Sequence, residues 1–236
     1  MVKILVIALE YNNLPNYRLK GCYNDALNFI DTIKYIRNVS DSDITFMNDN
    51  DYKFKEPLFP SKSNIIKQIK KLSQSQDKLF YVYMAGHGTT QTDYNNDESE
   101  LKSAHLDQII DLNSENKDSC LVTNDIYKIN VITDDTLNIM FSFFKKDTNI
   151  VGIMDMCHSG TIFDLKYLYL PILEDNKYKM LSGVYNKKPV KANITLFGGT
   201  RDNALAYEMR MSDKVNGVFT HSFCKVLRSV MKMNRI

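Results

Sequence analysis

Residues 79–88 read LFYVYMAGHG, and residues 149–160 read NIVGIMDMCHSG. Each stretch begins with a nearly continuous apolar run, which is typical of a strand buried on both faces of a parallel sheet. Each run then passes into a short glycine-containing segment that carries a reactive side chain, His87 in the first and Cys157 in the second. The two stretches therefore predict two buried strands that end in chemically reactive loops.

The rest of the chain continues this alternation. Further apolar runs predict strands over residues 3–9, 44–47 and 193–197. Apolar residues at helical spacing predict helices over 25–37, from Pro60-Ser61 to Leu72, from Thr133 to Phe144 and over 217–231. Strands that alternate with helices favour an α/β fold whose mostly parallel sheet carries helices on both faces. We expect a single domain over residues 1–236.

Two segments interrupt the pattern. Residues 89–117 are polar and acidic with weak periodicity, which predicts a long surface excursion with a short helix near residues 98–105. Residues 166–192 are rich in Lys, Tyr and Pro and predict an irregular connection. Excursions of this length in compact domains are usually functional or mobile.

The composition excludes several classes of protein. With 30 basic and 28 acidic residues, the net charge of +2 gives no reason to expect a nucleic-acid or membrane-surface partner. No apolar run approaches the roughly 18 residues of a membrane span, and the apolar start is too short for a signal peptide. We therefore expect an intracellular, cytoplasmic protein. The four scattered cysteines suggest neither a disulfide framework nor a zinc site.

The chemistry is expected at the carboxyl ends of the strands, where ligands bind in such sheets. A thiol nucleophile needs a base that is brought to it from another segment. We expect Cys157 to attack a carbonyl carbon and His87 to transfer the protons, with the backbone N–H groups of Gly88 and Cys157 as oxyanion donors. Cys157 is also expected to precede a helix, a position that favours the thiolate.

These residues have alternative interpretations. A single strand-end histidine is usually structural, and a single cysteine is usually a small buried apolar residue. A Cys-x5-Arg phosphatase is excluded because position 163 is Phe163. His158 is a competing base by proximity, but neighbouring residues at a turn generally point apart, which favours His87. The two motifs together are much harder to dismiss than either one alone.

Several ordered motifs make the chain similar to the metacaspases, a family of the caspase-like clan of cysteine peptidases. Residues 20–26, KGCYNDA, are similar to the family's R-G-C-x-N-D-A. AGHG resembles S-G-H-G, DMCHSGT resembles D-S-C-H-S-G-T, and residues 217–220, GVFT, resemble the G-x-x-T that opens the last core helix. The resemblance implies a caspase-like three-layer αβα sandwich. It divides the chain into a large-subunit-like part (1–165), a connecting segment (166–192) and a small-subunit-like part (193–236).

The resemblance also implies an endopeptidase that cleaves after Arg or Lys. A basic P1 side chain requires carboxylates in its pocket. Asp25 and Asp155 match the family's pocket acids, Cys22 matches a residue that lines the same pocket, and Glu208 aligns with a further pocket acid in a drifted motif. Asp155 lies two residues before Cys157, so both side chains are expected on the same side of an extended segment. The alternative for Asp25 is an N-cap of the first helix.

Calcium activation is the further implication. Asp118, Asp134, Asp135 and Asp164 match the family's four calcium-binding aspartates, and carboxylate oxygens suit a hard cation. The alternative is that Asp134 and Asp135 cap a helix while the others are solvated. The family also implies a monomer. A basic-specific peptidase is expected to cut itself in the connecting segment, which offers Lys177, Lys179, Lys187, Lys188 and Lys191.

Two departures from the family pattern affect the P1 pocket. Ala85 replaces the Ser that usually stands two residues before the catalytic His, so one pocket hydroxyl is missing. The region around Glu208 has diverged from the family motif. These two departures leave open an alternative function, in which the chain is a catalytically weak caspase-like module that regulates or binds a partner.

Overall fold

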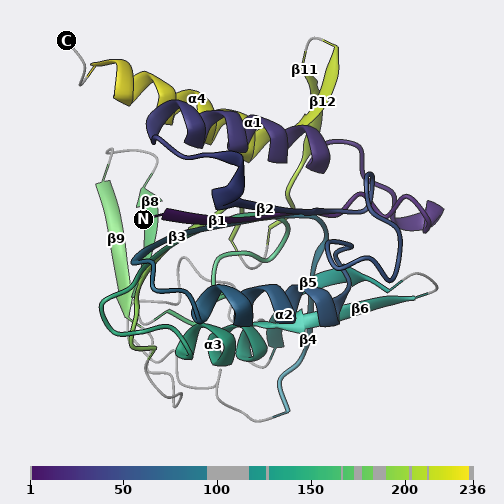
Figure 1. The fold of residues 1–236 in the computed structure, drawn as a ribbon, viewed down its shortest axis with the longest axis horizontal. Helices are drawn as coiled ribbons and strands as arrows, with labels where there is room; N and C mark the ends of the chain where they lie inside the picture. The colour runs from purple at the N-terminus through teal and green to yellow at the C-terminus, as the bar shows by residue number, and fades with distance from the viewer. Residues whose placement is uncertain are drawn as a thin grey trace.

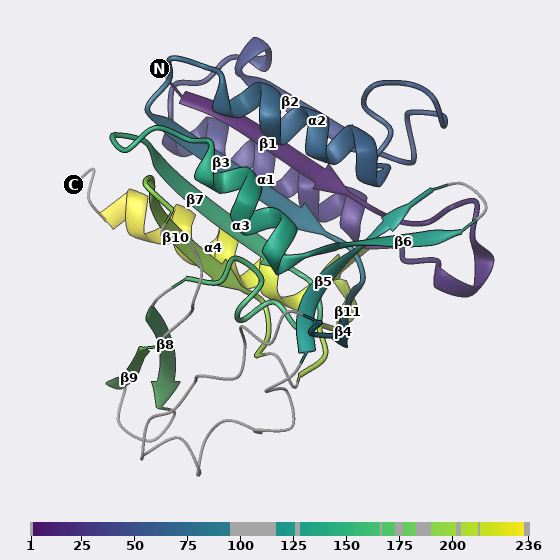
Figure 2. The same cartoon turned by 90° about the horizontal axis from the view of Figure 1, so that it is seen from below.

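The central sheet has five parallel strands between two layers of helices, as Figures 1 and 2 show. The computed structural model describes residues 2–94, 117–125, 128–165, 167–172, 177–182, 190–201, 204–211 and 213–233. The sheet consists of β1 (Val2–Ala8), β2 (Ile44–Asn48), β3 (Leu79–Ala85), β7 (Asn149–Asp155) and β10 (Asn193–Gly198), in the order β10-β7-β3-β1-β2. The expected three-layer αβα sandwich is confirmed, and each of the five expected strands forms.

Two helices cover each face of this sheet. Helices α1 (Cys22–Ile36) and α4 (Val218–Met233) pack on one face, and α2 (Lys62–Ser73) and α3 (Asp134–Ser142) lie on the other (Figure 1). Strand β3 shows how the sheet serves both layers, because alternate side chains of a strand point to opposite faces. Phe80, Val82 and Met84 join one apolar cluster, and Tyr81, Tyr83 and Ala85 join the other. Full burial of a side chain such as Phe80 contributes roughly 1.5–3 kcal/mol.

The helix starts follow from local hydrogen bonds. The Ser61 hydroxyl accepts a hydrogen bond from the Asn64 N–H (3.4 Å) at the start of α2, and Thr133 accepts one from the Thr136 N–H (3.1 Å) at the start of α3. Helix α1 begins at Cys22, with Gly21 as its N-cap. Asp25 therefore lies inside the first turn, so the alternative that Asp25 caps the helix is wrong.

A second, antiparallel sheet extends from the carboxyl end of β3. Its strands are β4 (Gly88–Thr92), β5 (Lys117–Asn124) and β6 (Ile129–Thr133), in the order β4-β5-β6. The expected surface excursion thus begins as a paired strand. The short helix that we expected near residues 98–105 lies outside the described residues.

Two hairpins complete the described part of the chain. Strands β8 (Tyr167–Ile172) and β9 (Lys177–Ser182) pair antiparallel, so the expectation of an irregular connection is wrong for these residues. Strands β11 (Glu208–Met211) and β12 (Lys214–Gly217) form the second hairpin, which leads directly into α4. Of the expected self-cleavage positions, Lys187 and Lys188 lie outside the described residues. No helix in the described ranges has the length and apolarity that crossing a membrane requires.

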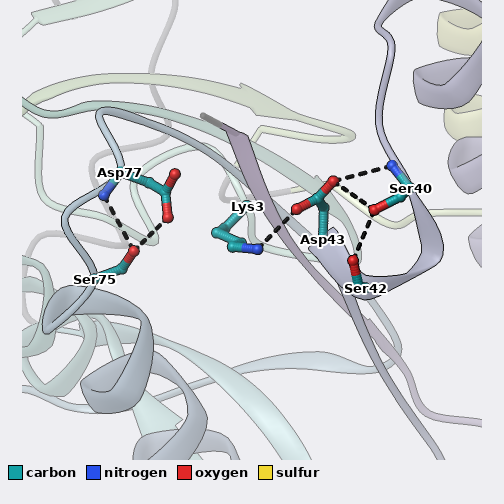
Figure 3. Close-up of polar contacts among 6 residues, drawn as sticks. All are labelled: Lys3, Ser40, Ser42, Asp43, Ser75 and Asp77. Carbon is teal, nitrogen blue, oxygen red and sulfur yellow. Dashed lines mark hydrogen bonds and ion pairs between the residues drawn. The ribbon is translucent and has the colours of Figure 1, made fainter.

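Half-buried and exposed polar side chains gather near the amino ends of β1, β2 and β3 in two hydrogen-bonded groups (Figure 3). Lys3 on β1 forms an ion pair with Asp43 (Nζ to Oδ1, 2.7 Å), just before β2. Asp43 also accepts hydrogen bonds from the Ser40 N–H (3.0 Å) and hydroxyl (2.8 Å). The hydrogen bond from Lys3 holds the pKa of Asp43 well below its usual range, and the Ser75 hydroxyl lowers the pKa of Asp77.

Candidate active site

The register of the sheet brings His87 and Cys157 together. Strands β3 and β7 are parallel neighbours in which Ala85 pairs with Asp155. His87 and Cys157 each lie two residues beyond this pair. The Gly86 N–H donates to the Asp155 carbonyl (3.3 Å), which keeps the two loops adjacent as they leave the sheet. The predicted pair of reactive groups therefore occupies neighbouring strand ends.

The two glycines beside His87 allow neighbouring segments of the protein to approach the His87 loop closely. A Cβ on Gly88 would lie 2.8 Å from the Cys157 carbonyl carbon and would overlap its oxygen. A Cβ on Gly86 would lie 2.9 Å from the Tyr11 hydroxyl oxygen. Real Cβ atoms avoid such distances, so only glycine allows the His87 loop to pass between Tyr11 and the Cys157 loop.

The His87 imidazole is oriented by a backbone carbonyl. Its Nε2 lies 2.7 Å from the carbonyl oxygen of Tyr17, in the 3-10 turn Pro15–Tyr17. A carbonyl oxygen only accepts hydrogen bonds, so Nε2 must carry the proton. The other nitrogen, Nδ1, is then the one with a free lone pair, and it is the atom that can act as a base.

The Cys157 thiol is half-buried at a sharp turn. Its sulfur accepts a hydrogen bond from the Ala206 N–H (3.2 Å), on the segment before β11. The next residue, His158, has a φ of 53°, in the left-handed region that non-glycine residues rarely adopt. Residues 156–165 form turns and bends. The expectation that a helix starts just after Cys157 is therefore wrong, and the N–H of Ala206 contacts the sulfur instead.

The β4–β5 ladder leaves the Gly88 N–H directed away from β5. Gly88 pairs with Leu121 in the register, so His87 stands opposite Val122, whose N–H donates to the His87 carbonyl (3.0 Å). Hydrogen-bonded and non-hydrogen-bonded pairs alternate along an antiparallel ladder. Gly88 therefore occupies a non-hydrogen-bonded position, and its backbone lies against that of Cys157. This geometry suits the predicted oxyanion donors.

The two predicted pocket acids meet at Gly217. Asp25 accepts hydrogen bonds from the Gly217 N–H (2.6 Å) and the Asn216 side chain (3.0 Å). Asp155 accepts two from Thr220, through its N–H (3.0 Å) and its hydroxyl (2.6 Å). A Cβ on Gly217 would lie 3.0 Å from Oδ2 of Asp25 and closer still to Oδ2 of Asp155, so both carboxylates border one small space.

Burial dominates the electrostatics of this pair. Asp25 is 2% exposed and Asp155 is 7% exposed. Burial raises the pKa of Asp25 to about 7, against the hydrogen bonds from Gly217 and Asn216 and with help from the negative charges of Asp155 and Glu208. Burial likewise raises the pKa of Asp155. Two buried carboxylates in one space form a site that a cation would stabilise.

The other predicted pocket residues surround this pair. Cys22 is buried, which raises the pKa of its thiol well above the usual range, and the charges of Glu208, Asp155 and Asp25 act in the same direction. Ala85 is buried in the same cluster as Cys22. The exposed Glu208 accepts hydrogen bonds from the N–H groups of Gly21 (2.6 Å) and Lys20 (3.1 Å), so its carboxylate lies at the N-terminus of α1.

Sequence reasoning missed two residues at the end of β1. Glu10 is buried beside the pocket, where it accepts a hydrogen bond from the Tyr23 N–H (3.2 Å), and burial raises its pKa. Tyr11 is fully buried and contacts the backbone of His87. A buried acid directly after an apolar strand was a signal for Glu10, whereas nothing in the sequence marks the contacts of Tyr11.

The four predicted calcium ligands lie on neighbouring segments. Asp118, Asp134 and Asp164 are buried, and Asp135 is half-buried. Asp134 accepts a hydrogen bond from the Ser119 N–H (2.6 Å), and the Ser119 hydroxyl lies 3.3 Å from that of Thr161, three residues before Asp164. Within the described ranges, however, no three His, Cys, Asp or Glu side chains form a group that could hold a metal ion. The donor chemistry suits calcium, but the ligand set is not closed.

Comparison with known proteins gives a consistent result. The family model for the metacaspase, peptidase C14 domain matches residues 2–166. Metacaspase III c of Phaeodactylum tricornutum is 30% identical over 171 residues, which are 71% of this chain and 45% of the relative. Metacaspase-1 of Candida glabrata is 24% identical over 95% of this chain and 64% of the relative. The chain thus spans about half to two thirds of the length of these relatives.

A solved structure shares the fold. The crystal structure of protein GSU0716 from Geobacter sulfurreducens matches with a TM-score of 0.60 and 20% sequence identity. The match covers 96% of this chain and 82% of that protein. At this level of identity the likeness concerns the fold alone.

Proposed function

The chain belongs to the metacaspase family of C14 cysteine peptidases, and on that premise we propose that it is an endopeptidase that cleaves after Arg or Lys. The observation that carries the proposal is the convergence of His87, Cys157 and two buried acids at the ends of β3 and β7. The family membership confirms the resemblance seen in the motifs.

The proposed reaction is acyl transfer through a thioester. Nδ1 of His87 takes the proton of the Cys157 thiol, the resulting thiolate forms a bond to the scissile carbonyl carbon, and the N–H groups of Gly88 and Cys157 donate to the oxyanion. The C–N bond then breaks, and protonated His87 gives the proton on Nδ1 to the leaving amine. His87 next takes a proton from water, which attacks the thioester, and the carboxylic product and the thiolate are released.

The preference for a basic P1 residue rests on Asp25 and Asp155. Both carboxylates are buried, lie against Gly217 and have raised pKa values. A guanidinium or ammonium group that enters this space would restore their ionised forms. Glu208 adds negative charge nearby. A neutral or acidic P1 side chain would leave the repulsion between the acids uncompensated.

The catalytic role of Cys157 has a direct test. Cys157→Ala is expected to abolish cleavage of fluorogenic peptides with Arg or Lys at P1, because the variant has no nucleophile. Cys224→Ala, in a buried part of α4, is the matched control and should retain activity. Equal turnover by wild type and Cys157→Ala would sink the proposal. Labelling of Cys157 by an arginyl acyloxymethyl ketone would exclude the alternative of a non-catalytic regulatory module.

We further propose that calcium activates the enzyme through Asp118, Asp134, Asp135 and Asp164. The support is the oxygen-donor chemistry and the burial of three of these carboxylates on adjoining segments. Because the ligand set is not closed, binding would have to draw these segments together. No step of the proposed reaction passes through the metal.

Calcium binding can be separated from catalysis. In Cys157→Ala, millimolar calcium should raise the melting temperature, because a ligand that binds only the folded state stabilises it. The same shift should be lost in Cys157→Ala/Asp118→Asn. An unchanged melting temperature in the first protein, with no heat of calcium binding by calorimetry, would refute the proposal.

A further inference from the structure

We propose that Tyr11 is the positioning residue for His87, and that its hydroxyl group sets the place of the catalytic histidine in the loop after β3. The inference rests on the proposed function, because it assigns a role in the reaction that His87 performs. Tyr11 lies three residues beyond the end of β1, far from His87 in the sequence.

The Tyr11 hydroxyl bridges the position next to the first pair of the β4–β5 ladder. The register places His87 opposite Val122, and the Val122 N–H donates to the His87 carbonyl (3.0 Å). In a regular ladder the His87 N–H would return the bond to Val122. It donates instead to the Tyr11 hydroxyl oxygen (2.9 Å), and that hydroxyl donates to the Val122 carbonyl (2.8 Å). A phenol group thus bridges the pair at the residue that carries the base.

The hydroxyl is a fixed and permanent donor. Tyr11 is fully buried, and burial raises the pKa of its phenol well above the usual range, so the proton that it shares with Val122 stays in place. Its ring lies 5.0 Å from the His87 ring, centroid to centroid, with the planes tilted by 31°. Tyr11 therefore contacts both the backbone N–H and the ring of His87.

Tyr11 is itself held from the other side. Its φ of 54° is in the left-handed region, which a bulky residue adopts only where the surroundings enforce it. The enforcing group is Asp49, after β2, which accepts hydrogen bonds from the N–H groups of Tyr11 (2.7 Å) and Glu10 (2.8 Å). Asp49 in turn receives one from the Asn124 side chain on β5 (2.8 Å). A chain of contacts thus runs from β2 through Tyr11 to the base.

Loss of the hydroxyl would leave the His87 N–H and the Val122 carbonyl without their bridge. The N–H and the carbonyl would then form a hydrogen bond with each other or with water. Either change would move His87 relative to Cys157. Because small displacements of a catalytic group can lower rates by about 10²-fold, the expected consequence is slower chemistry. Substrate binding should change little, since Asp25 and Asp155 lie on other elements.

Tyr11→Phe is the main test variant, and Tyr81→Phe is its matched control. Tyr81 is a buried tyrosine in the middle of β3, and its hydroxyl accepts a hydrogen bond only from Arg37 (3.4 Å) among the described contacts. The measurements are kcat and KM with an Arg-P1 peptide, and the rate at which iodoacetamide alkylates Cys157, followed by mass spectrometry. Tyr11→Phe should lower kcat roughly 10- to 100-fold with KM nearly unchanged, and Tyr81→Phe should change neither.

The His87→Ala background separates positioning from general loosening. If Tyr11 acts through His87, Tyr11→Phe slows alkylation of Cys157 in the wild-type background but not in His87→Ala, because residues that act as a unit are non-additive. Equal slowing in both backgrounds would overturn the proposal, as would an unchanged kcat. Should Tyr11→Phe not fold, Asp49→Asn takes its place, with a smaller loss of kcat and the same dependence on His87.

The test also distinguishes this inference from the proposed function. A wild-type protein that cleaves no peptide would refute the peptidase, whereas the alkylation rates would still show whether Tyr11 acts through His87. A wild-type protein that cleaves normally, with a fully active Tyr11→Phe, would refute only the role of Tyr11.

Discussion

Aspartate side chains have pKa values that are shifted in opposite directions at the two ends of the central sheet. At the amino end, Asp43 is exposed enough to meet Lys3 and Ser40, and these partners lower its pKa (Figure 3). At the carboxyl end, Asp25 and Asp155 are buried beside each other, and their pKa values rise. At the amino end, the lysine that pairs with Asp43 belongs to the chain itself. Among the described residues, the hydrogen bonds to Asp25 and Asp155 come from neutral groups, and in the proposed function a basic substrate side chain would supply the positive charge.

The two ends also differ in what their charged groups contribute to stability and to function. Exposed ion pairs contribute little to stability and are screened by salt. Buried carboxylates without a cation cost free energy, which proteins typically tolerate at sites that serve binding or catalysis. The contrast therefore predicts that substitutions at the carboxyl end change activity strongly, whereas those at the amino end change it hardly at all.

Of the substitutions that compare the two ends of the sheet, Gly88→Ala is expected to have the largest effect. The added Cβ would collide with the Cys157 carbonyl group, so the His87 and Cys157 loops must separate. We expect kcat/KM to fall by about 10²-fold or more, by the logic of misplaced catalytic groups. Kinetics with an Arg-P1 peptide, together with circular dichroism to verify folding, measure this. A folded Gly88→Ala with wild-type kinetics would contradict the close approach of the two loops.

The second effect compares an aspartate at each end. Asp25→Asn is expected to lower kcat/KM for Arg-P1 peptides by about 10²-fold, because a hydrogen bond to a charged group and its Coulomb attraction are lost together. Asp43→Asn, at the amino end, should leave kcat/KM unchanged. Peptides with a neutral P1 residue provide the internal control, since Asp25→Asn should not slow their cleavage. Equal losses of kcat/KM for both peptides would show that Asp25 does not recognise the P1 side chain.

The third effect concerns the pH dependence of stability. The raised pKa of Asp25 means that the folded state holds more protons than the unfolded state between pH 3.8 and about 7. Stability therefore falls as the pH rises through this window, because the unfolded state binds fewer protons. Asp25→Asn removes this term, so its stability relative to wild type should rise between pH 5 and pH 8, by at most about 3 kcal/mol, because about two pKa units of the window lie above pH 5.

Urea unfolding at the two pH values measures this gain, and Asp43→Asn is the control of opposite sign. The lowered pKa of Asp43 contributes stability above its unfolded value of 3.8, and this contribution is lost only as the pH falls through the lower folded value. Its removal should therefore cost the same at pH 5 and pH 8. A gain for Asp25→Asn that does not depend on pH would show that Asp25 is ionised throughout.

The smallest effect is expected for Lys3→Ala. The ion pair with Asp43 is only partly buried, and ion pairs in contact with solvent contribute little. The melting temperature should fall slightly, and the difference should shrink as salt is added. Peptide cleavage should stay at the wild-type rate. A marked loss of activity would break the separation between the two ends of the sheet.

The sequence predicted the parallel sheet because buried strands are continuous apolar runs. The antiparallel strand β5 was not recognisable in this way. It buries Asp118, Ser119, Thr123 and Asn124, which in sequence suggest a loop. Asp118, Ser119 and Asn124 form hydrogen bonds with distant segments, as when the Asn124 side chain donates to Asp49 (2.8 Å), so no local pattern reveals these contacts.

The candidate site also contains residues that the sequence predicted and residues that it did not. His87, Cys157, Asp25 and Asp155 were predicted from motifs at strand ends and a helix start, and the structure brings the members of each pair together. The support around them was not predicted. Tyr11 reaches His87 and Val122 across 76 and 111 residues of sequence, and its role depends on a register that only the folded ladder defines.

The close approach at Gly88 constrains how this sequence can change during evolution. Every residue other than glycine carries a Cβ, so every missense change in the Gly88 codon meets the Cys157 carbonyl group. No gradual route through alanine or serine exists at this position while the two loops keep their places. A homologue with another residue here, even one that retains the histidine and the cysteine, has therefore rebuilt the loops or abandoned catalysis. The position thus offers a marker for inactive descendants that inspection of the two reactive side chains would miss.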